Sequence, residues 1–244
     1  EPRHPLRAYV CERCLLVQLP PHARPEAIFS DYAYFSSYSD LWLGHARRFA
    51  TEATQRLGLG PGSLVLEVAS NDGYLLTWFK EAGVPVLGVD PAANVVAVAE
   101  AHGVPTIRAF FGLAVGEELA REGRQADLVV ANNVLAHVPD LDDFVAGLAR
   151  VLSHTGALSV EVPHLMRLIE RAQFDTIYHE HFSYFTLLTV RRLFARHGLE
   201  VYDVEELDTH GGSLRIWAQH RGGPRAVEAA PERLLAEEAA RGLH

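Results

Sequence analysis

Apolar runs of strand length alternate with helix-length amphipathic segments through the middle of the chain. Five such runs, rich in Val, Leu and Ala, span residues 63–69, 84–90, 104–110, 127–134 and 157–163. Their apolar character is continuous, which is typical of parallel strands buried on both faces. The pattern predicts an α/β protein with a doubly wound, Rossmann-like sheet, whose ligands bind beyond the carboxyl ends of the strands.

Further elements follow the same logic. Two more strands are expected at 199–207 and 213–220, and we expect the second to close the sheet as an antiparallel strand. Helices are expected in four other segments, which are 45–57, 165–174, 186–198 and the charged amphipathic tail at 229–244.

The two ends of the chain differ from its middle. The start is rich in proline and is followed by an aromatic segment, residues 29–42 (FSDYAYFSSYSDLW), which is either a lid or packing that joins the ends to the core. Four parts are therefore expected: a partial zinc-binding module (1–30), an aromatic and helical connector (31–57), the main domain (58–222) and a C-terminal helix that leads toward a further domain (223–244).

Composition narrows the classes of function. The chain is 48% hydrophobic and 22% charged, and no apolar stretch is long enough for a membrane span. The net charge of −9 has the wrong sign for attraction to a nucleic-acid backbone. Two cysteines and no secretory leader favour the cytoplasm. We expect a cytoplasmic protein with a small-molecule ligand and neither nucleic acid nor membrane as partner, and monomer remains one option for its oligomeric state.

Polar residues at the end of the first strand indicate which ligand the sheet holds. Glu67 lies within that strand, and Asn71, Asp72 and Gly73 form the turn after it. A dinucleotide site needs several glycines here, so that the backbone can approach a pyrophosphate. This turn has one glycine, which suits S-adenosylmethionine, a cofactor without phosphate whose amino and carboxylate groups need polar side chains.

The next strands supply further cofactor candidates. Asp90 ends the second strand, where an acidic side chain can accept both ribose hydroxyls of an adenosine. An Asp-Pro pair also commonly begins a helix, and the two roles are compatible. Asn132 and Asn133 end the fourth strand and are expected to face the ligand, together with Tyr32 of the aromatic segment.

Several motifs together resemble a known family. These motifs are similar to those of the sugar C-methyltransferases, which add a methyl branch to a nucleotide-linked keto-deoxysugar: VCERCLLVQL, DYAYFSSYSDLW, EVASNDGYLL, GVDPAANV, NNVLAHVPD, FDTIYHEHFSYF and THGGSLRIWA. The resemblance runs from about Tyr9 to Ala218. It implies a class I methyltransferase fold and S-adenosylmethionine-dependent methylation, with C3 beside a 4-keto group of a thymidine-diphosphate sugar as the expected target, as in antibiotic biosynthesis. Family members carry a further Cys-x-x-Cys upstream and a second Rossmann-like domain downstream.

The segment Tyr178-His179-Glu180-His181 supplies candidates for the chemistry. Methylating carbon requires a base and a group that stabilises an enolate oxygen. If the segment is helical, Tyr178 and His181 share a face, and either could abstract the proton while Glu180 holds the imidazole in its tautomer. The resemblance implies roles for these three residues and for His137, which we assign to polarise the keto oxygen. Simple packing is the alternative, although four consecutive polar, ionisable side chains are costly to bury.

Three residues are candidate substrate contacts. His210 precedes two glycines with exposed N–H groups, and Arg215 could bind a sugar diphosphate through two hydrogen bonds. Arg215 could equally lie on the solvated face of a hairpin. His179 is the third candidate, and a metal site built on His179 and His181 is disfavoured because no further ligand has a convincing spacing.

Cys11 and Cys14 have the spacing of half a zinc knuckle, which uses four ligands. Either His4 and His22 complete the site, or, as the resemblance suggests, a second cysteine pair lies upstream. In the second case the first twenty residues are expected to lack ordered structure, because half a ligand set gives little folding energy. Redox activity is disfavoured, since the pair lacks a βαβ setting.

Three other functions compete with sugar C-methylation. The chain could methylate oxygen or nitrogen of a small molecule, with the histidine cluster deprotonating a hydroxyl. It could be an inactive, zinc-stabilised binding module, although the joint presence of the cofactor and histidine candidates argues against this. A nicotinamide oxidoreductase is disfavoured by the turn with one glycine.

Overall fold

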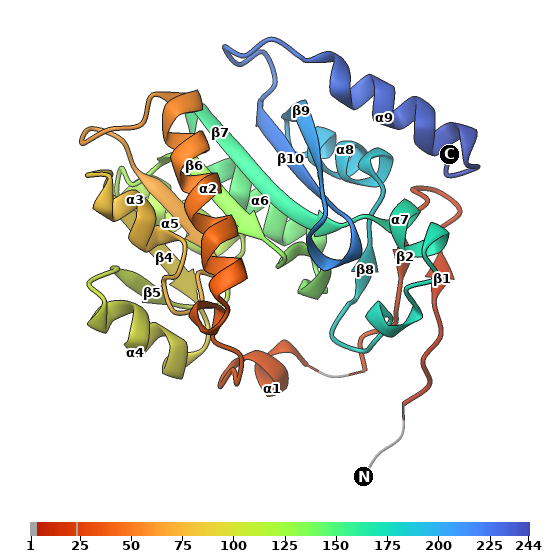
Figure 1. Cartoon of the computed structure of the whole chain (residues 1–244), viewed down its shortest axis with the longest axis horizontal. Helices are drawn as coiled ribbons and strands as arrows, with labels where there is room; N and C mark the ends of the chain where they lie inside the picture. The colour runs from red at the N-terminus through yellow and green to blue at the C-terminus, as the bar shows by residue number, and fades with distance from the viewer. Residues whose placement is uncertain (1–3, 23) are drawn as a thin grey trace.

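A mostly parallel sheet runs through the computed structural model, which describes residues 4–22 and 24–244 (Figure 1). Five neighbouring strands, from β5 to β7, are parallel, and the remaining two are linked to them through antiparallel pairing. In spatial order the strands are β5 (Thr106–Arg108), β4 (Val86–Asp90), β3 (Val65–Val68), β6 (Ala126–Asn132), β7 (Leu152–Pro163), β10 (Ser213–His220) and β9 (Leu199–Leu207).

Helices cover both faces of the sheet (Figure 1). Along β6, Leu128 and Val130 pack against one group of helices, whereas Val129 and Ala131 pack against the other. Burial of both faces explains the continuous apolar runs in the sequence. The first group is α2 (Asp40–Leu57), α3 (Leu76–Glu81) and α4 (Ala93–Ala101), and the second is α5 (Leu113–Arg121), α6 (Leu141–Val151) and α8 (Leu187–Arg196).

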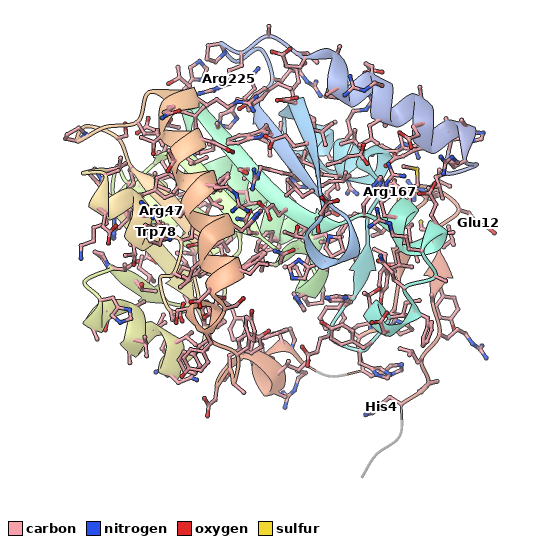
Figure 2. All side chains as sticks on the ribbon, viewed as in Figure 1. His4, Glu12, Arg47, Trp78, Arg167 and Arg225 are labelled. Atoms are coloured by element: carbon pink, nitrogen blue, oxygen red, sulfur yellow. The ribbon has the colours of Figure 1, made fainter. Side chains whose placement is uncertain are left out.

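Helix α2 begins earlier than expected and belongs to the core. The hydroxyl of Ser39 accepts the N–H of Trp42 at 3.3 Å and so caps the helix. Phe49 is 1% exposed and packs against the sheet. At the surface, the Arg47 guanidinium lies 5.2 Å from the ring centre of Trp78 in α3 (Figure 2). The connector suggested by the sequence therefore supplies part of the sheet's covering layer.

The prediction that the last strand closes the sheet is wrong. β10 pairs with β7 on one side and with β9 on the other, so β9 forms the edge. β10 is buried along nearly its whole length, whereas β9 is only partly buried and carries Glu200, Asp203, Glu205 and Glu206. Charged side chains suit an edge strand because they discourage pairing with another chain.

A second, three-stranded sheet joins the N-terminal residues to a distant segment. It consists of β1 (Tyr9–Val10), β2 (Val17–Gln18) and β8 (Ser183–Tyr184), in that order. Leu19 continues the pairing, because its N–H donates to the carbonyl of Phe182 at 2.9 Å. The expectation that these residues lack ordered structure is wrong from residue 4 onward, since β8 provides a partner that the hairpin does not have by itself. Residues 1–3 lie outside the described part.

The remaining helices are α1 (Pro25–Phe29), α7 (Leu165–Glu170) and α9 (Ala229–Ala240). α9 packs across the outer side of α8 and β9, with Leu234 4% exposed (Figure 1). Among the residues that the structure describes, no helix combines the length and the apolar character that a bilayer crossing requires.

Candidate active site

A cavity of about 290 Å³ lies at the carboxyl ends of β3, β4 and β6. This position is where open α/β sheets bind ligands. Phe111 and Phe144 contribute aromatic surface to its wall. Of the residues that the sequence assigned to a cofactor, those on the wall are Tyr32, Asn71, Asp90 and Asn133.

The turn after β3 requires backbone conformations that few residues adopt. Asn71 and Gly73 both have positive φ angles, of 50° and 78°. A Cβ added at Gly73 would lie 3.1 Å from a methyl of Val104 and 3.3 Å from the Cβ of Ala99. The single glycine of the motif is therefore needed for a tight passage of the chain between its neighbours.

Asp90 occupies the end of β4 and is 6% exposed. One carboxylate oxygen accepts the N–H of Asn71 and the other accepts the N–H of Ala92, each at 2.9 Å. The second bond holds Ala92, the residue just before α4, but Asp90 does not cap the helix itself. Burial raises the pKa of Asp90. Each oxygen keeps a second lone pair that can accept a hydroxyl in the cavity.

Glu67 and Asp72 are each 1% exposed and lie outside the cavity wall. Burial raises the pKa of Glu67 well above its ordinary value, and the negative charges of Asp90 and Asp72 add to the effect. Within the described chain, Glu67 Oε2 and Asp72 Oδ1 have no hydrogen-bond partner. Unpaired buried acceptors are uncommon, so these two oxygens indicate a donor supplied by a ligand or by water.

Two asparagines fasten the aromatic segment beside the cavity. Asn94 accepts the N–H of Tyr32 at 3.1 Å and donates to its carbonyl at 2.7 Å. Asn71 accepts the N–H of Ser36 and donates to the carbonyl of Tyr34, both at 3.0 Å. The side chain of Asn71 is therefore held by the chain itself, and its direct contact with a cofactor stays a prediction. Tyr32 is held on the cavity wall as a consequence.

Asn133 follows β6 with a φ of 53°, which is uncommon outside glycine. Its N–H donates to the carbonyl of Glu161 at 2.8 Å, and its side chain lines the cavity. Neither amide atom of that side chain has a hydrogen-bond partner among residues 4–22 and 24–244. Asn133 is therefore free to bind a ligand, whereas Asn132 lies off the cavity wall.

The predicted catalytic residues meet beside this cavity. The ring centres of His137 and His181 are 4.8 Å apart, and those of Tyr178 and His181 are 4.3 Å apart. The hydroxyl of Tyr178 lies 3.1 Å from Nε2 of His181. His137 also lines the cavity, so it connects the two groups of residues. We call Tyr178, His181 and His137 the catalytic cluster.

A turn, and not the helix that we expected, brings Tyr178 to His181. The His181 N–H donates to the Tyr178 carbonyl at 3.0 Å. Nδ1 of His181 lies 2.9 Å from the carbonyl of Thr176, which can only accept, so Nδ1 carries the proton. Nε2 is then the basic nitrogen. Burial lowers the pKa of His181, which keeps its ring neutral at neutral pH.

His137 is oriented in the same way. Its Nδ1 lies 2.9 Å from the carbonyl of Glu180 and must donate to it, which leaves Nε2 as an acceptor. Burial lowers the pKa of His137 to about 4, and His181 adds to the effect. A neutral ring with this tautomer has no proton to give to a keto oxygen. The expected polarising role of His137 therefore disagrees with its hydrogen bonding.

The carboxylate of Glu180 acts on the neighbouring phenols. Main-chain carbonyls orient both imidazoles, so the prediction that the Glu180 side chain orients His181 is wrong. Burial raises the pKa of Tyr178 to about 12, and the charge of Glu180 adds to this shift. Burial also raises the pKa of Tyr32, again with a contribution from Glu180. The carboxylate thus favours the protonated form of both phenols.

His210 lies within electrostatic reach of the catalytic cluster. Its φ of 51° is uncommon for a residue with a side chain, and its ring centre is 5.2 Å from that of Trp42. Burial lowers the pKa of His210. Burial is the main cause of the lowered pKa of His181, and His210 lowers it a little further, whereas the hydrogen bond to the Thr176 carbonyl raises it.

Arg215 agrees with neither of its two interpretations. It is 4% exposed, which excludes a solvated face, and its guanidinium binds Glu161 at 2.6 Å and Glu205 at 3.1 Å. With these carboxylates bound, it is not free for a diphosphate. His45 also contacts Glu161, at 3.1 Å, in a buried network that our sequence analysis missed. Its only local indication was a charged residue, Glu161, inside an otherwise apolar strand.

Cys11 and Cys14 are both free thiols in this structure. Backbone N–H groups of Cys14 and Arg13 lower the pKa of the Cys11 thiol, as suits a metal-binding turn. In the described ranges, no three His, Cys, Asp or Glu side chains gather to hold a metal ion. The hypothesis that His4 and His22 complete the site is therefore wrong. A structural zinc site needs two ligands beyond this pair.

The fold is similar to those of solved proteins, one of which is a named methyltransferase. The PH0226 protein from Pyrococcus horikoshii aligns with a TM-score of 0.62 and 15% identity, over 80% of this chain and 97% of that one. Magnesium protoporphyrin IX methyltransferase from Synechocystis, solved with bound SAH, aligns with a TM-score of 0.56 and 19% identity, over 77% and 89%. At these identities the likeness concerns the fold alone, and it confirms the predicted class I methyltransferase architecture.

Sequence comparisons identify the family. The chain is 41% identical over 239 residues to the C-methyltransferase NovU from Streptomyces niveus, which covers 98% of this chain and 57% of NovU. This chain thus spans little more than half of that relative's length. The family model described as a methyltransferase domain matches residues 42–204. The family model covers most of the chain, which therefore belongs to the methyltransferase domain family.

Proposed function

We propose that the protein transfers the methyl group of S-adenosylmethionine to C3 of a nucleotide-linked 4-keto-deoxysugar, with a thymidine-diphosphate sugar as the expected substrate. The observation that carries the proposal is a neutral imidazole base in contact with a phenol, beside the cavity at the strand ends. A C–H bond next to a ketone releases its proton only when a base is present and the oxygen charge is stabilised. The 41% identity to a protein named C-methyltransferase supports the same chemistry.

The residues around the cavity suit this cofactor. Asp90 would accept the ribose hydroxyls and Asn133 would bind through its free amide, whereas Glu67 and Asp72 lie behind the cavity wall and would reach the cofactor only through water. When bound, S-adenosylmethionine supplies an activated methyl group on a sulfonium, which the substrate carbon takes. His137 stays neutral beside this site, so no imidazolium charge opposes a cationic ligand.

Each residue of the catalytic pair has a distinct task in this proposal. Nε2 of His181 takes the proton from C3, and the electrons of the C–H bond move toward C4, which leaves negative charge on the keto oxygen. The Tyr178 hydroxyl turns from His181 to that oxygen, and a pKa of about 12 keeps the phenol protonated. Once the new carbon–carbon bond forms, the carbonyl is restored and His181 releases its proton to solvent.

Deuterium exchange at C3 tests the enolate directly. The protein is incubated in D₂O with a thymidine-diphosphate 4-keto-deoxysugar and S-adenosylhomocysteine, which has no methyl group to transfer, and the C3 proton is followed by NMR. We expect exchange with the wild type. Absence of exchange, while the sugar nucleotide binds, would overturn carbon chemistry and favour methylation of oxygen or nitrogen.

Calorimetry separates an enzyme from an inactive binding module. We expect saturable binding of S-adenosylhomocysteine, weakened at least about tenfold by Asp90→Ala, because the carboxylate is the proposed ribose acceptor. Asp208→Ala, at an exposed position just after the edge strand β9, should bind as the wild type does. No heat with the wild type would favour the inactive module.

We also propose that Cys11 and Cys14 bind a structural zinc ion as two of four ligands. The spacing of the thiols and the lowered pKa of Cys11 support a thiolate pair at this turn. Zinc content measured by mass spectrometry should fall when both cysteines are replaced by serine. An unchanged content, or none in the wild type, would refute the site.

A further inference from the structure

Three histidines form a second cluster, next to the catalytic one. The ring centres of His4 and His22 are 5.2 Å apart, and both rings contact His179, at 6.2 and 5.9 Å. Figure 2 shows His4 at the lower edge of the molecule, beneath the chain that leads into β8. His179 directly follows Tyr178 in the sequence, so one member of the trio is a chain neighbour of the catalytic cluster.

Antiparallel pairing brings these histidines together. Gln18 pairs with Ser183, and the N–H of Leu19 donates to the carbonyl of Phe182 at 2.9 Å. Beyond this contact the two chains continue in opposite directions, so His22 comes alongside His179. The small sheet thus delivers two N-terminal imidazoles to the side of the catalytic turn.

The trio offers hydrogen-bonding atoms that the protein does not use. Nε2 of His22 and Nε2 of His179 are buried and have no hydrogen-bond partner in the described part of the molecule. A buried polar atom without a partner costs free energy, because it has given up its hydrogen bond to water. A ligand that hydrogen-bonds to both nitrogens would recover this cost on binding.

The arrangement of the rings favours an anion over a metal ion. A metal must lie close to the plane of each imidazole that binds it, because the nitrogen lone pair lies in that plane. The rings of His4 and His22 are stacked, at an interplanar angle of 18°, so a single ion cannot lie in both planes. A diphosphate has oxygens several ångströms apart, and each can accept an N–H from a different ring.

We propose that His4, His22 and His179 bind the diphosphate of the nucleotide-linked substrate. This inference rests on the proposed function, which requires the diphosphate to lie one sugar ring away from the base. The diphosphate is attached to C1 of the sugar, two bonds from the carbon that loses its proton. His179 beside Tyr178 meets that spacing, and it gives the N-terminal module a direct part in substrate binding.

Binding of dTDP and of thymidine, measured by calorimetry, tests the site. We expect His22→Leu to weaken dTDP at least about tenfold, whereas thymidine, which lacks the diphosphate, and S-adenosylhomocysteine should bind as to the wild type. His22→Gln keeps an N–H donor and should recover part of the dTDP affinity. His154→Gln, an exposed histidine whose ring stacks on His220, is the matched control and should change nothing.

Each contrary result has a defined meaning. Unchanged dTDP affinity in His22→Leu, with S-adenosylhomocysteine binding retained, overturns the site. If His22→Leu fails to fold, the exposed His4→Leu carries the same expectation and the same test. If the wild type binds zinc and these variants do not, the histidines form a metal site, and the proposed diphosphate site is wrong. If dTDP binding depends on these histidines but C3 does not exchange deuterium, this inference holds and the enolate chemistry is refuted.

Discussion

At the scale of single residues, main-chain carbonyls set the chemistry of the catalytic cluster. The carbonyls of Thr176 and Glu180 each accept a proton from Nδ1 of one imidazole. Both rings therefore present Nε2 as an acceptor, and burial lowers the pKa of each. Within the cluster only the Tyr178 hydroxyl can donate a hydrogen bond to a ligand, so Tyr178 is the donor and His181 is left as the base.

Replacement of His181 by alanine should therefore remove the base and leave the fold intact. We expect turnover to fall at least about 10²-fold, as is typical for loss of a general base. Calorimetry with S-adenosylhomocysteine should give a wild-type affinity, because His181 is absent from the cavity wall. An equal loss of cofactor affinity would show that His181 supports the site and is not its base.

The low pKa of His137 makes stability depend on pH. The folded value of about 4 lies below the ordinary value of 6.5, so the unfolded chain binds more protons between these limits. The free energy of unfolding should be highest above pH 6.5 and should fall by about 1 to 3 kcal/mol as the pH drops toward 4. Urea unfolding at several pH values should show a shallower fall for His137→Gln. Equal slopes in both proteins would contradict the burial of this ring.

At the scale of elements, the turn after β3 depends on a position without a side chain. Gly73→Ala adds both backbone strain and a Cβ 3.1 Å from Val104, whereas Gly123→Ala adds strain alone, because nothing lies within 4 Å of its new atom. We expect Gly123→Ala to cost about 1 to 2 kcal/mol of unfolding free energy, and Gly73→Ala at least about 1 kcal/mol more. Chemical denaturation of both variants measures the difference. Equal costs would mean that the turn has room to relax.

The central position of β10 places a charged network inside the sheet. Arg215→Met should cost about 3 to 5 kcal/mol, because it leaves Glu161 buried with His45 as its remaining partner. Arg191→Met is the surface comparison: Arg191 binds Glu232 at 2.7 Å and both side chains are exposed, so about 1 kcal/mol or less is expected.

Urea unfolding checks both arginine variants, and the double variant Glu161→Gln with Arg215→Met should recover much of the loss. A small effect of Arg215→Met alone would show that Glu161 becomes protonated or solvated without difficulty.

At the scale of the whole molecule, the sequence predicted what local patterns encode. Burial on both faces produces continuous apolar runs, so the parallel strands and their helical layers could be predicted. Asp90 is the last residue of a predicted strand, and the cavity lies at that end of the strand. The contact between Tyr178 and His181 could be expected from their spacing, although a turn and not a helix produces it.

Features that depend on distant partners could not be predicted. The insertion of β10 between β7 and β9 follows from a hairpin that folds back into the sheet. His45, Glu161 and Arg215 lie in three different elements that are far apart in the sequence, so their spacing could not predict the network. The two imidazoles are oriented by backbone carbonyls. Every residue type has such a carbonyl, so the sequence cannot show which ones will meet a histidine.

The shared edge between β2 and β8 has a consequence for any shortened form of this protein. A chain that starts at residue 31 would keep every strand of the large sheet and the whole cavity wall contributed by β3, β4 and β6. It would lose the neighbour that steadies Phe182–Tyr184, immediately beyond His181. Such a remnant should still fold and still take up its cofactor, yet hold its base and phenol too loosely to turn over.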